Sequence, residues 1–257
     1  MKLSLRMPCV LALIAIGTAL GCPAAKADYK PRLFSKPEDV IWTTALKELS
    51  EDVQRQLAFR AVFGTEREAE IAIDQETFVY VPQQVLWLDE TAVLVTLGRN
   101  PGASHAGTGW FGVHYLTAGS SGFVPIGNWP SLVSGNGFGG PPSWQLNKDL
   151  LNHTVIVVES EYTAQGITTG TVTLVEFQPE GPVVVAELAG SCSNEGFTDD
   201  PDKLRTATLS LAPMLYGGGA FAANYMGTHP TSVIYERTGT LFQRTAKSPP
   251  APDCEDF

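Results

Sequence analysis

The sequence has few of the residues from which metal sites are usually built. Its 257 residues include four cysteines and four histidines, and the histidines form neither an H-x-H nor an H-x-x-x-H pair. Zinc sites normally place a second cysteine or histidine within a few residues of the first. We therefore expect no metal, no cofactor and no catalytic residue that a sequence motif would identify.

Basic residues are also scarce. The chain has 17 lysines and arginines against 27 aspartates and glutamates, which gives a formal net charge of -10 and a pI near 4.8. Proteins that bind nucleic acids cluster basic side chains to neutralise phosphates, whereas here the basic residues are scattered singly. This distribution argues against a nucleic-acid partner.

Long apolar runs are missing as well. A membrane-spanning helix needs roughly 20 apolar residues, but the longest run, residues 10–20, is shorter. It follows a basic start and precedes Ala25-Lys26-Ala27, an order that is typical of a secretory signal. We expect cleavage after residue 27 and a soluble periplasmic or secreted protein with no membrane span, whose formal charge is -13 because residues 1–27 hold three basic and no acidic groups.

A lipid anchor is the alternative to this soluble form. Residues 19–22, Ala-Leu-Gly-Cys, resemble a bacterial lipobox, although the motif favours Leu where Ala19 stands. Lipidation of Cys22 would then hold the protein on a membrane.

The four cysteines divide evenly between the signal and the rest of the chain. Cys9 and Cys22 belong to the signal, which leaves Cys192 and Cys254. Two remaining cysteines usually pair in an oxidising compartment. We predict a Cys192–Cys254 disulfide that ties down an otherwise extended tail, residues 248–257.

An N-terminal helical segment is expected over residues 28–76. Ser35 with Glu38 resembles a capping box, Ser50 is placed to cap a second helix, and Gly64 is placed to end it. Apolar residues recur between these points at steps of three and four, which predicts one broken helix or two short helices with a single packed stripe. The stripe comprises Ile41, Ala45, Leu46, Leu49, Val53, Leu57 and Ala61.

Short β-branched and aromatic runs, separated by turn residues, dominate residues 77–247. The expected strands are 77–81, 85–88, 92–97, 111–116, 123–126, 154–159, 171–177, 183–188, 206–211, 220–225, 232–236 and 240–244. The chain is therefore expected to be mainly β after its helical segment.

An internal repeat is predicted within this region. Aligning residues 92–95 with 154–157 also aligns Gly122 with Gly181 and Gly137-Phe138 with Gly196-Phe197. Each unit is a three-strand meander, and meanders stack because one alone cannot bury its apolar face. Units at about 85–145, 150–200 and 204–247 predict a twisted sheet pair with the helices on one face or end, and an incomplete propeller-like stack is the alternative.

Candidate binding residues come from one acidic loop and from loop aromatics. Asp199, Asp200 and Asp202 lie in the densest carboxylate cluster, but they lack the spacing of a calcium loop. Residues 102–106, Gly-Ala-Ser-His-Ala, depart from the nucleophile elbow at the last glycine and lie between two expected strands. Tryptophans beside glycine or proline loops could contact a ligand or pack in the core; these are Trp110, Trp129 and Trp144.

These observations predict an exported binding protein without catalysis that uses acidic residues to bind a basic partner protein. Inhibitors, toxin-neutralising immunity proteins and envelope accessory factors act in this way. The acids of the helical segment, Glu48, Glu51 and Asp52, could serve as well as the aspartate loop. The alternative is a secreted or periplasmic hydrolase whose carboxylates, or serine and histidine, converge only in the fold.

Overall fold

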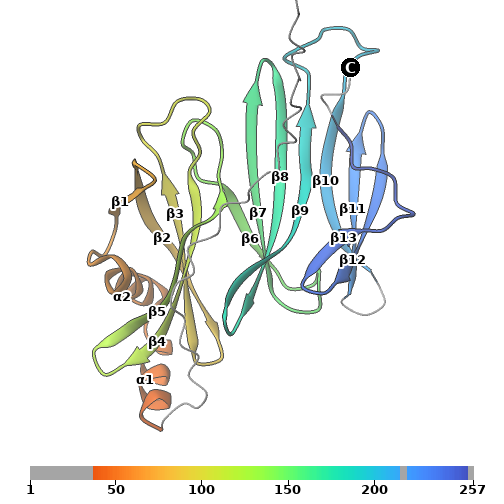
Figure 1. Cartoon of the computed structure of the whole chain (residues 1–257). Helices are drawn as coiled ribbons and strands as arrows, with labels where there is room; N and C mark the ends of the chain where they lie inside the picture. Colours follow the sequence, from red (N-terminus) through yellow and green to blue (C-terminus); the bar gives the residue numbers. More distant parts are fainter. Residues whose placement is uncertain (1–36, 215–218, 254–257) are drawn as a thin grey trace, which may run out of the picture.

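The computed structural model describes residues 37–214 and 219–253, which form two helices and thirteen strands (Figure 1). The protein is mainly β with helices at its N-terminal end, as the sequence predicts. The predicted export signal, Cys22 and Cys254 lie outside the described residues. Within the described part, no helix is long and apolar enough to span a membrane.

The two helices are α1 (Pro37–Lys47) and α2 (Glu51–Phe63). The Ser50 hydroxyl accepts a hydrogen bond from the Val53 amide at 3.4 Å, and Gly64 ends α2 in the left-handed conformation with φ of 77°. The predicted cap and end of the second helix are therefore confirmed. The capping box at Ser35 falls outside the described residues.

The predicted apolar stripe is wrong in part. Leu46, Ala58 and Phe59 are buried, but Ile41 is 65% exposed and Val53 is 40% exposed. The break before α2 changes the direction of the chain, so one stripe cannot run along both helices. Gln54 on α2 is buried instead, and its side-chain nitrogen donates to the Leu49 carbonyl while its side-chain oxygen accepts from the Trp87 indole.

The first sheet has five antiparallel strands in the order β1-β2-β3-β4-β5. Its strands are β1 (Ala69–Ile73), β2 (Glu76–Leu88), β3 (Thr91–Arg99), β4 (Trp110–Gly119) and β5 (Gly122–Ser134). The helical segment thus ends before the expected boundary at 76, because β1 already belongs to this sheet. The two strands expected at 77–81 and 85–88 are one strand, β2, with an irregularity between Pro82 and Gln84.

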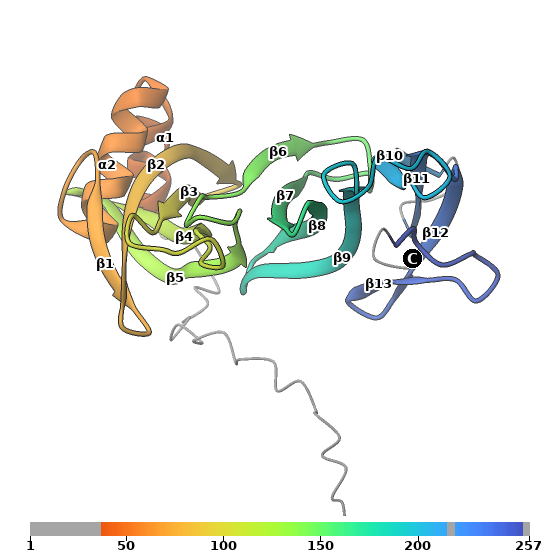
Figure 2. The same ribbon diagram turned by 90° about the horizontal axis from the view of Figure 1, so that it is seen from above.

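The second sheet has eight antiparallel strands in chain order from β6 to β13, and it curls into a half-barrel (Figure 2). Its strands are β6 (Ser143–Asn147), β7 (Val155–Ala164), β8 (Ile167–Gln178), β9 (Gly181–Ser193), β10 (Thr206–Pro213), β11 (Ala220–Gly227), β12 (Thr231–Thr238) and β13 (Leu241–Arg244). All of these strands except β6 are among those expected from the sequence.

Three hydrophobic clusters hold these layers together. One joins α2 to the first sheet and includes Phe59 and Tyr80. The second joins the two sheets through β3 to β5 on one side and β7 and β8 on the other, and it includes Phe111 and Ile156. The third fills part of the inside of the curled sheet, around Phe221.

The segments aligned as an internal repeat lie in β3 to β5 and in β7 to β9, one set in each sheet. The two hairpin glycines have positive φ, 115° at Gly122 and 140° at Gly181, as the turn chemistry predicts. The repeat of three-strand meanders itself stays a prediction.

The C-terminal tail is held more firmly than expected. The Ser248 hydroxyl accepts from the Ile234 amide at 2.9 Å, and Arg244 donates to the Ser248 carbonyl at 2.6 Å. Asp253 lines the same hollow as Cys192, which brings the end of the described chain beside that cysteine. The Cys192–Cys254 disulfide stays a prediction, because Cys254 is not described.

Candidate functional site: the groove of the curled sheet

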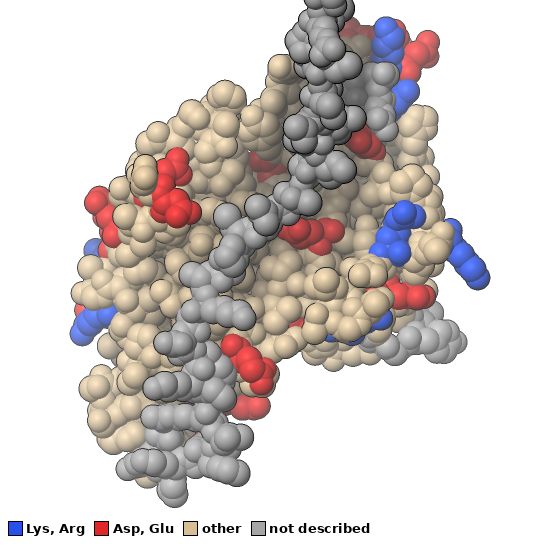
Figure 3. Space-filling model, viewed as in Figure 1, with Lys and Arg blue, Asp and Glu red and all other residues tan. Residues whose placement is uncertain are grey.

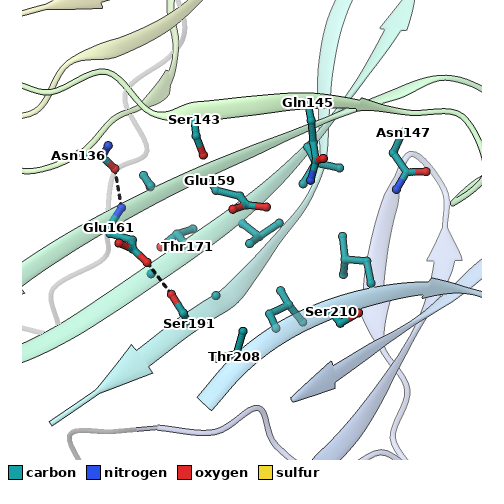
Figure 4. Close-up of a pocket in the computed structure, with 17 residues that line it drawn as sticks. Asn136, Ser143, Gln145, Asn147, Glu159, Glu161, Thr171, Ser191, Thr208 and Ser210 are labelled. Carbon is teal, nitrogen blue, oxygen red and sulfur yellow. Dashed lines mark hydrogen bonds between the residues drawn. The ribbon is translucent and has the colours of Figure 1, made fainter. Parts of the chain in front are cut away.

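A groove with a cavity volume of about 810 Å³ lies in the curled sheet and is lined by strands from β6 to β10 (Figure 4). Polar groups on the lining come from Asn136, Ser143, Gln145, Asn147, Glu159, Ser160, Glu161, Thr171, Ser191, Thr208 and Ser210. Because so many polar side chains line one groove, we take it as the candidate site.

The groove follows from a change of side-chain character along β7. Successive side chains of a strand point to opposite faces, so every second residue shares a face. On this face Val155 and Val157 contribute to the hydrophobic cluster, and Glu159 and Glu161 come next in the same alternation. The apolar end of the face is packed, and the acidic end borders the groove.

Two glycines help to leave this space open. Gly170 on β8 and Gly190 on β9 both line the groove. A Cβ atom built on Gly190 would lie 2.9 Å from the Gly170 carbonyl carbon. The strands approach too closely here for a larger residue, so no side chain fills this part of the groove.

Glu161 is held in place from two sides. The Ser191 hydroxyl donates to its carboxylate at 2.8 Å, and its own amide donates to the Asn136 side-chain oxygen at 2.7 Å. Figure 4 shows both hydrogen bonds. Asn136 is itself fixed, because its side-chain nitrogen donates to the Pro141 carbonyl at 2.8 Å. The position of Glu161 is therefore set before any ligand binds.

Glu159 lies beside Ser143 in the register of β6 and β7, and its side chain is exposed to the groove. Among the described residues that line the groove there is no lysine, arginine or histidine, so within this part of the chain the two carboxylates have no cationic neighbour on its walls. An adjoining hollow shares Glu161, Ser191 and Thr208 and adds Glu195. The groove can attract an ammonium or guanidinium group, and its hydroxyls and amides can bind polar backbone groups.

The predicted aspartates lie outside this groove. Asp199, Asp200 and Asp202 belong to the exposed connection between β9 and β10. The Oδ2 atom of Asp200 lies 3.6 Å from the Lys203 ammonium, and the Oδ1 atom of Asp200 accepts a hydrogen bond from the Asp202 amide. Arg205 donates to the Asp202 carbonyl. Local contacts within the loop thus partly offset its negative charge.

The three predicted tryptophans take part in packing. Trp110 lies 6.3 Å from Phe78, Trp129 lies 5.2 Å from Tyr115, and Trp144 lies 6.0 Å from Phe111, measured between ring centroids. The structure does not bring them together on one loop surface. They belong to the hydrophobic clusters on the two faces of the first sheet.

Acidic residues are spread over the face of the molecule that Figure 3 draws. In Figure 3 they appear as separate groups over both sheets and near the helices. The helix acids Glu48, Glu51 and Asp52 are exposed, and Asp52 pairs with Arg55 at 2.5 Å. The face shown therefore has no single acidic patch, whereas the groove holds two glutamates, Glu159 and Glu161.

The Ser–His segment and the potential metal ligands do not form a further site in the described part of the chain. Ser104 and His105 lie in the connection between β3 and β4, as expected. In the described ranges, no group of three or more histidine, cysteine, aspartate or glutamate side chains could hold a metal ion.

Sequence reasoning missed Glu159 and Glu161. The sequence feature that could have indicated them is the run Val155-Ile156-Val157-Val158-Glu159-Ser160-Glu161, in which one face of a strand changes from valine to glutamate. This change marks a groove only because the sheet curls, and the curl cannot be read from a local sequence pattern.

No protein-family model, curated protein or solved structure was found to match this chain.

Proposed function

We propose that this protein is an exported binding protein without catalysis, and that the groove of the curled sheet binds a basic segment of a partner protein. One observation carries the proposal: Glu159 and Glu161 lie in a groove whose lining, in the part of the chain that the structure describes, contains no basic side chain. A lysine or arginine of the partner would supply the missing opposite charge. The mature charge of -13 would further speed the approach of a basic partner.

The rest of the lining favours a peptide segment as the ligand. Serine, threonine, asparagine and glutamine side chains carry both hydrogen-bond donors and acceptors, which match the N–H and C=O groups of a polypeptide. Ser143, Gln145 and Asn147 supply such groups along one wall, and Thr208 and Ser210 supply them along another (Figure 4). Inhibitors, immunity proteins and envelope accessory factors are the classes of exported protein that work by such binding.

The proposal is tested with the peptide Lys-Val-Lys-Val-Lys-Val-Lys-Val and its glutamate counterpart. Calorimetric or fluorescence titration should show binding of the lysine peptide only. Affinity should fall steeply as the salt concentration rises, because the screening length falls from about 10 Å at 0.1 M to about 3 Å at 1 M. Glu159→Gln combined with Glu161→Gln should weaken binding by about tenfold or more, since hydrogen bonds to charged groups contribute about 1.5–3 kcal/mol each.

Glu187→Gln is the matched control. Glu187 is an exposed glutamate on β9, and it does not line the groove. Its replacement removes one negative charge, as each of Glu159→Gln and Glu161→Gln does on its own, and should leave the affinity for the lysine peptide almost unchanged. If Glu187→Gln lowered the affinity for the lysine peptide as much as the two groove replacements do, the proposal would be overturned. Hydrolysis of a substrate that depends on one of the groove carboxylates would also overturn it.

A further inference from the structure

Strand β10 is paired along the whole of one edge but hardly at all along the other. All residues from Ala207 to Pro213 have partners in β11. On the side of β9, only Thr206 and Ala207 are paired, with Ser193 and Cys192. Among the strands that the structure describes, none continues this second ladder beyond Ala207.

The hydrogen bonds at the start of β10 show which backbone groups face the open edge. The Thr206 carbonyl accepts from the Thr228 amide, so Thr206 faces β11. The Arg205 carbonyl accepts from the Asn194 amide, so Arg205 faces the side of β9. In an antiparallel strand the backbone N–H and C=O groups of successive residues point alternately to the two edges, and the register of β10 with β11 has no irregularity. The N–H and C=O groups of Leu209 and Leu211 therefore point to the open edge.

Pro213 agrees with this assignment. It follows Leu209 and Leu211 in the same alternation, so its nitrogen also faces the open edge. Proline has no N–H to donate, and within sheets it is confined mainly to edges where that donor is not needed. Its presence in β10 is compatible with the ladder to β11 because the missing donor is on the other side.

The open edge borders the acidic groove. Residues from Thr208 to Leu211 all line it, so both faces of the strand and its edge are at the groove. Figure 4 places Thr208 and Ser210 on the wall opposite Gln145, with Glu159, Glu161 and Thr171 between these walls. Open strand edges pair readily with another extended chain.

We infer that the groove binds its partner segment as an added β-strand along β10, paired to the backbone of Leu209 and Leu211. This inference rests on the proposed function and names the form in which the basic segment binds. In strand addition the main chain supplies affinity and alternate side chains supply specificity. Every second residue of the segment faces the groove carboxylates, so the partner carries basic residues at alternating positions of an extended stretch.

Backbone methylation of the lysine–valine peptide tests this pairing. In a strand added to one edge, only every second amide donates to β10. Two peptides are compared, one N-methylated at all lysines and the other at all valines. One of them should bind about tenfold or more weakly than the parent, because its pairing donors are lost, and the other should bind nearly as well.

The outcomes separate the two proposals. Equal binding of both methylated peptides and the parent, with the dependence on Glu159 and Glu161 retained, overturns strand addition and leaves the proposed function in place. Equal weakening of both methylated peptides also overturns it, because a single added edge requires only one set of amides. Absence of binding by the parent peptide overturns the proposed function and this inference together.

Amide hydrogen exchange provides a second readout on the full chain. The lysine peptide should protect the amides of Leu209 and Leu211 about tenfold or more, whereas Thr208 and Ser210 face β11 and should change little. Protection of all four amides alike would overturn the inference. So would protection of Leu209 and Leu211 that rises with protein concentration alone, because the edge would then belong to a second copy of this chain.

Discussion

His114 shows how a single polar residue is accommodated inside the first sheet. It is fully buried, with Asn128 Oδ1 2.5 Å from its Nδ1 and the Thr96 hydroxyl 3.0 Å from its Nε2. The amide oxygen can only accept, so Nδ1 donates to it and Nε2 accepts from Thr96. The Phe63 ring meets the imidazole at 5.0 Å. Both nitrogens are satisfied in the neutral ring, and no group here compensates for a positive charge.

Burial lowers the pKa of His114 from 6.5 to about 4, although the hydrogen bond to Asn128 opposes the change. The unfolded chain therefore binds a proton between these pH values and the folded chain does not. Stability should fall as the pH decreases from 6.5 to 4, by about 3 kcal/mol in total at 1.36 kcal/mol per pH unit.

Urea unfolding of the wild type and of His114→Gln at several pH values checks this expectation. Glutamine keeps a donor and an acceptor but does not titrate in this range. The stability difference between the two proteins should depend on pH between 6.5 and 4 and should level off outside that range. A difference that is constant with pH would contradict the account.

At the scale of elements, an ion pair inside the curled sheet connects strands that are distant in the ladder. Glu176 on β8 binds Arg237 on β12, and His153 lies 2.9 Å from the same carboxylate. The Glu176 side chain is only 7% exposed. The Arg237 guanidinium also lies 4.5 Å from the centroid of the Phe242 ring. These contacts help to hold the two arms of the half-barrel together.

Arg237→Met should destabilise the protein by about 3 kcal/mol or more, because it leaves a buried carboxylate without its main partner. Glu176→Met together with Arg237→Met should recover most of this loss, since a buried ion pair often contributes little more than apolar side chains of similar size. Chemical denaturation of both variants measures the two effects. A double variant less stable than the single one would contradict this assignment.

Many of the elements could be predicted from local patterns. The cap at Ser50 and the left-handed Gly64 depend only on neighbouring residues, and most strands were found from β-branched runs. Strands β1 and β6, Ala69–Ile73 and Ser143–Asn147, were missed because neither contains the β-branched or aromatic run by which the other strands were found. The buried stripe of the helices was placed wrongly because the direction of α2 depends on its contacts with the sheet.

At the scale of the whole molecule, the groove could not be predicted because it depends on two long-range features. One is the curl that brings β6 and β10 to opposite walls, and the other is the separation of β9 from β10 after Ala207. The net charge of the chain favours an acidic binding site, which stays a prediction, but a net charge does not say where in the fold the acidic residues lie. The candidate acids therefore shift from the loop at Asp199 to Glu159 and Glu161.

Zero-length cross-linking tests the location of the binding site most directly. A carbodiimide joins a lysine of the lysine–valine peptide to a carboxylate that it contacts, and mass spectrometry identifies the modified residue. The account predicts cross-links at Glu159 and Glu161 that disappear at high salt. Cross-links mainly at Asp199, Asp200 and Asp202, or spread evenly over the acids of the helices and loops, would contradict it.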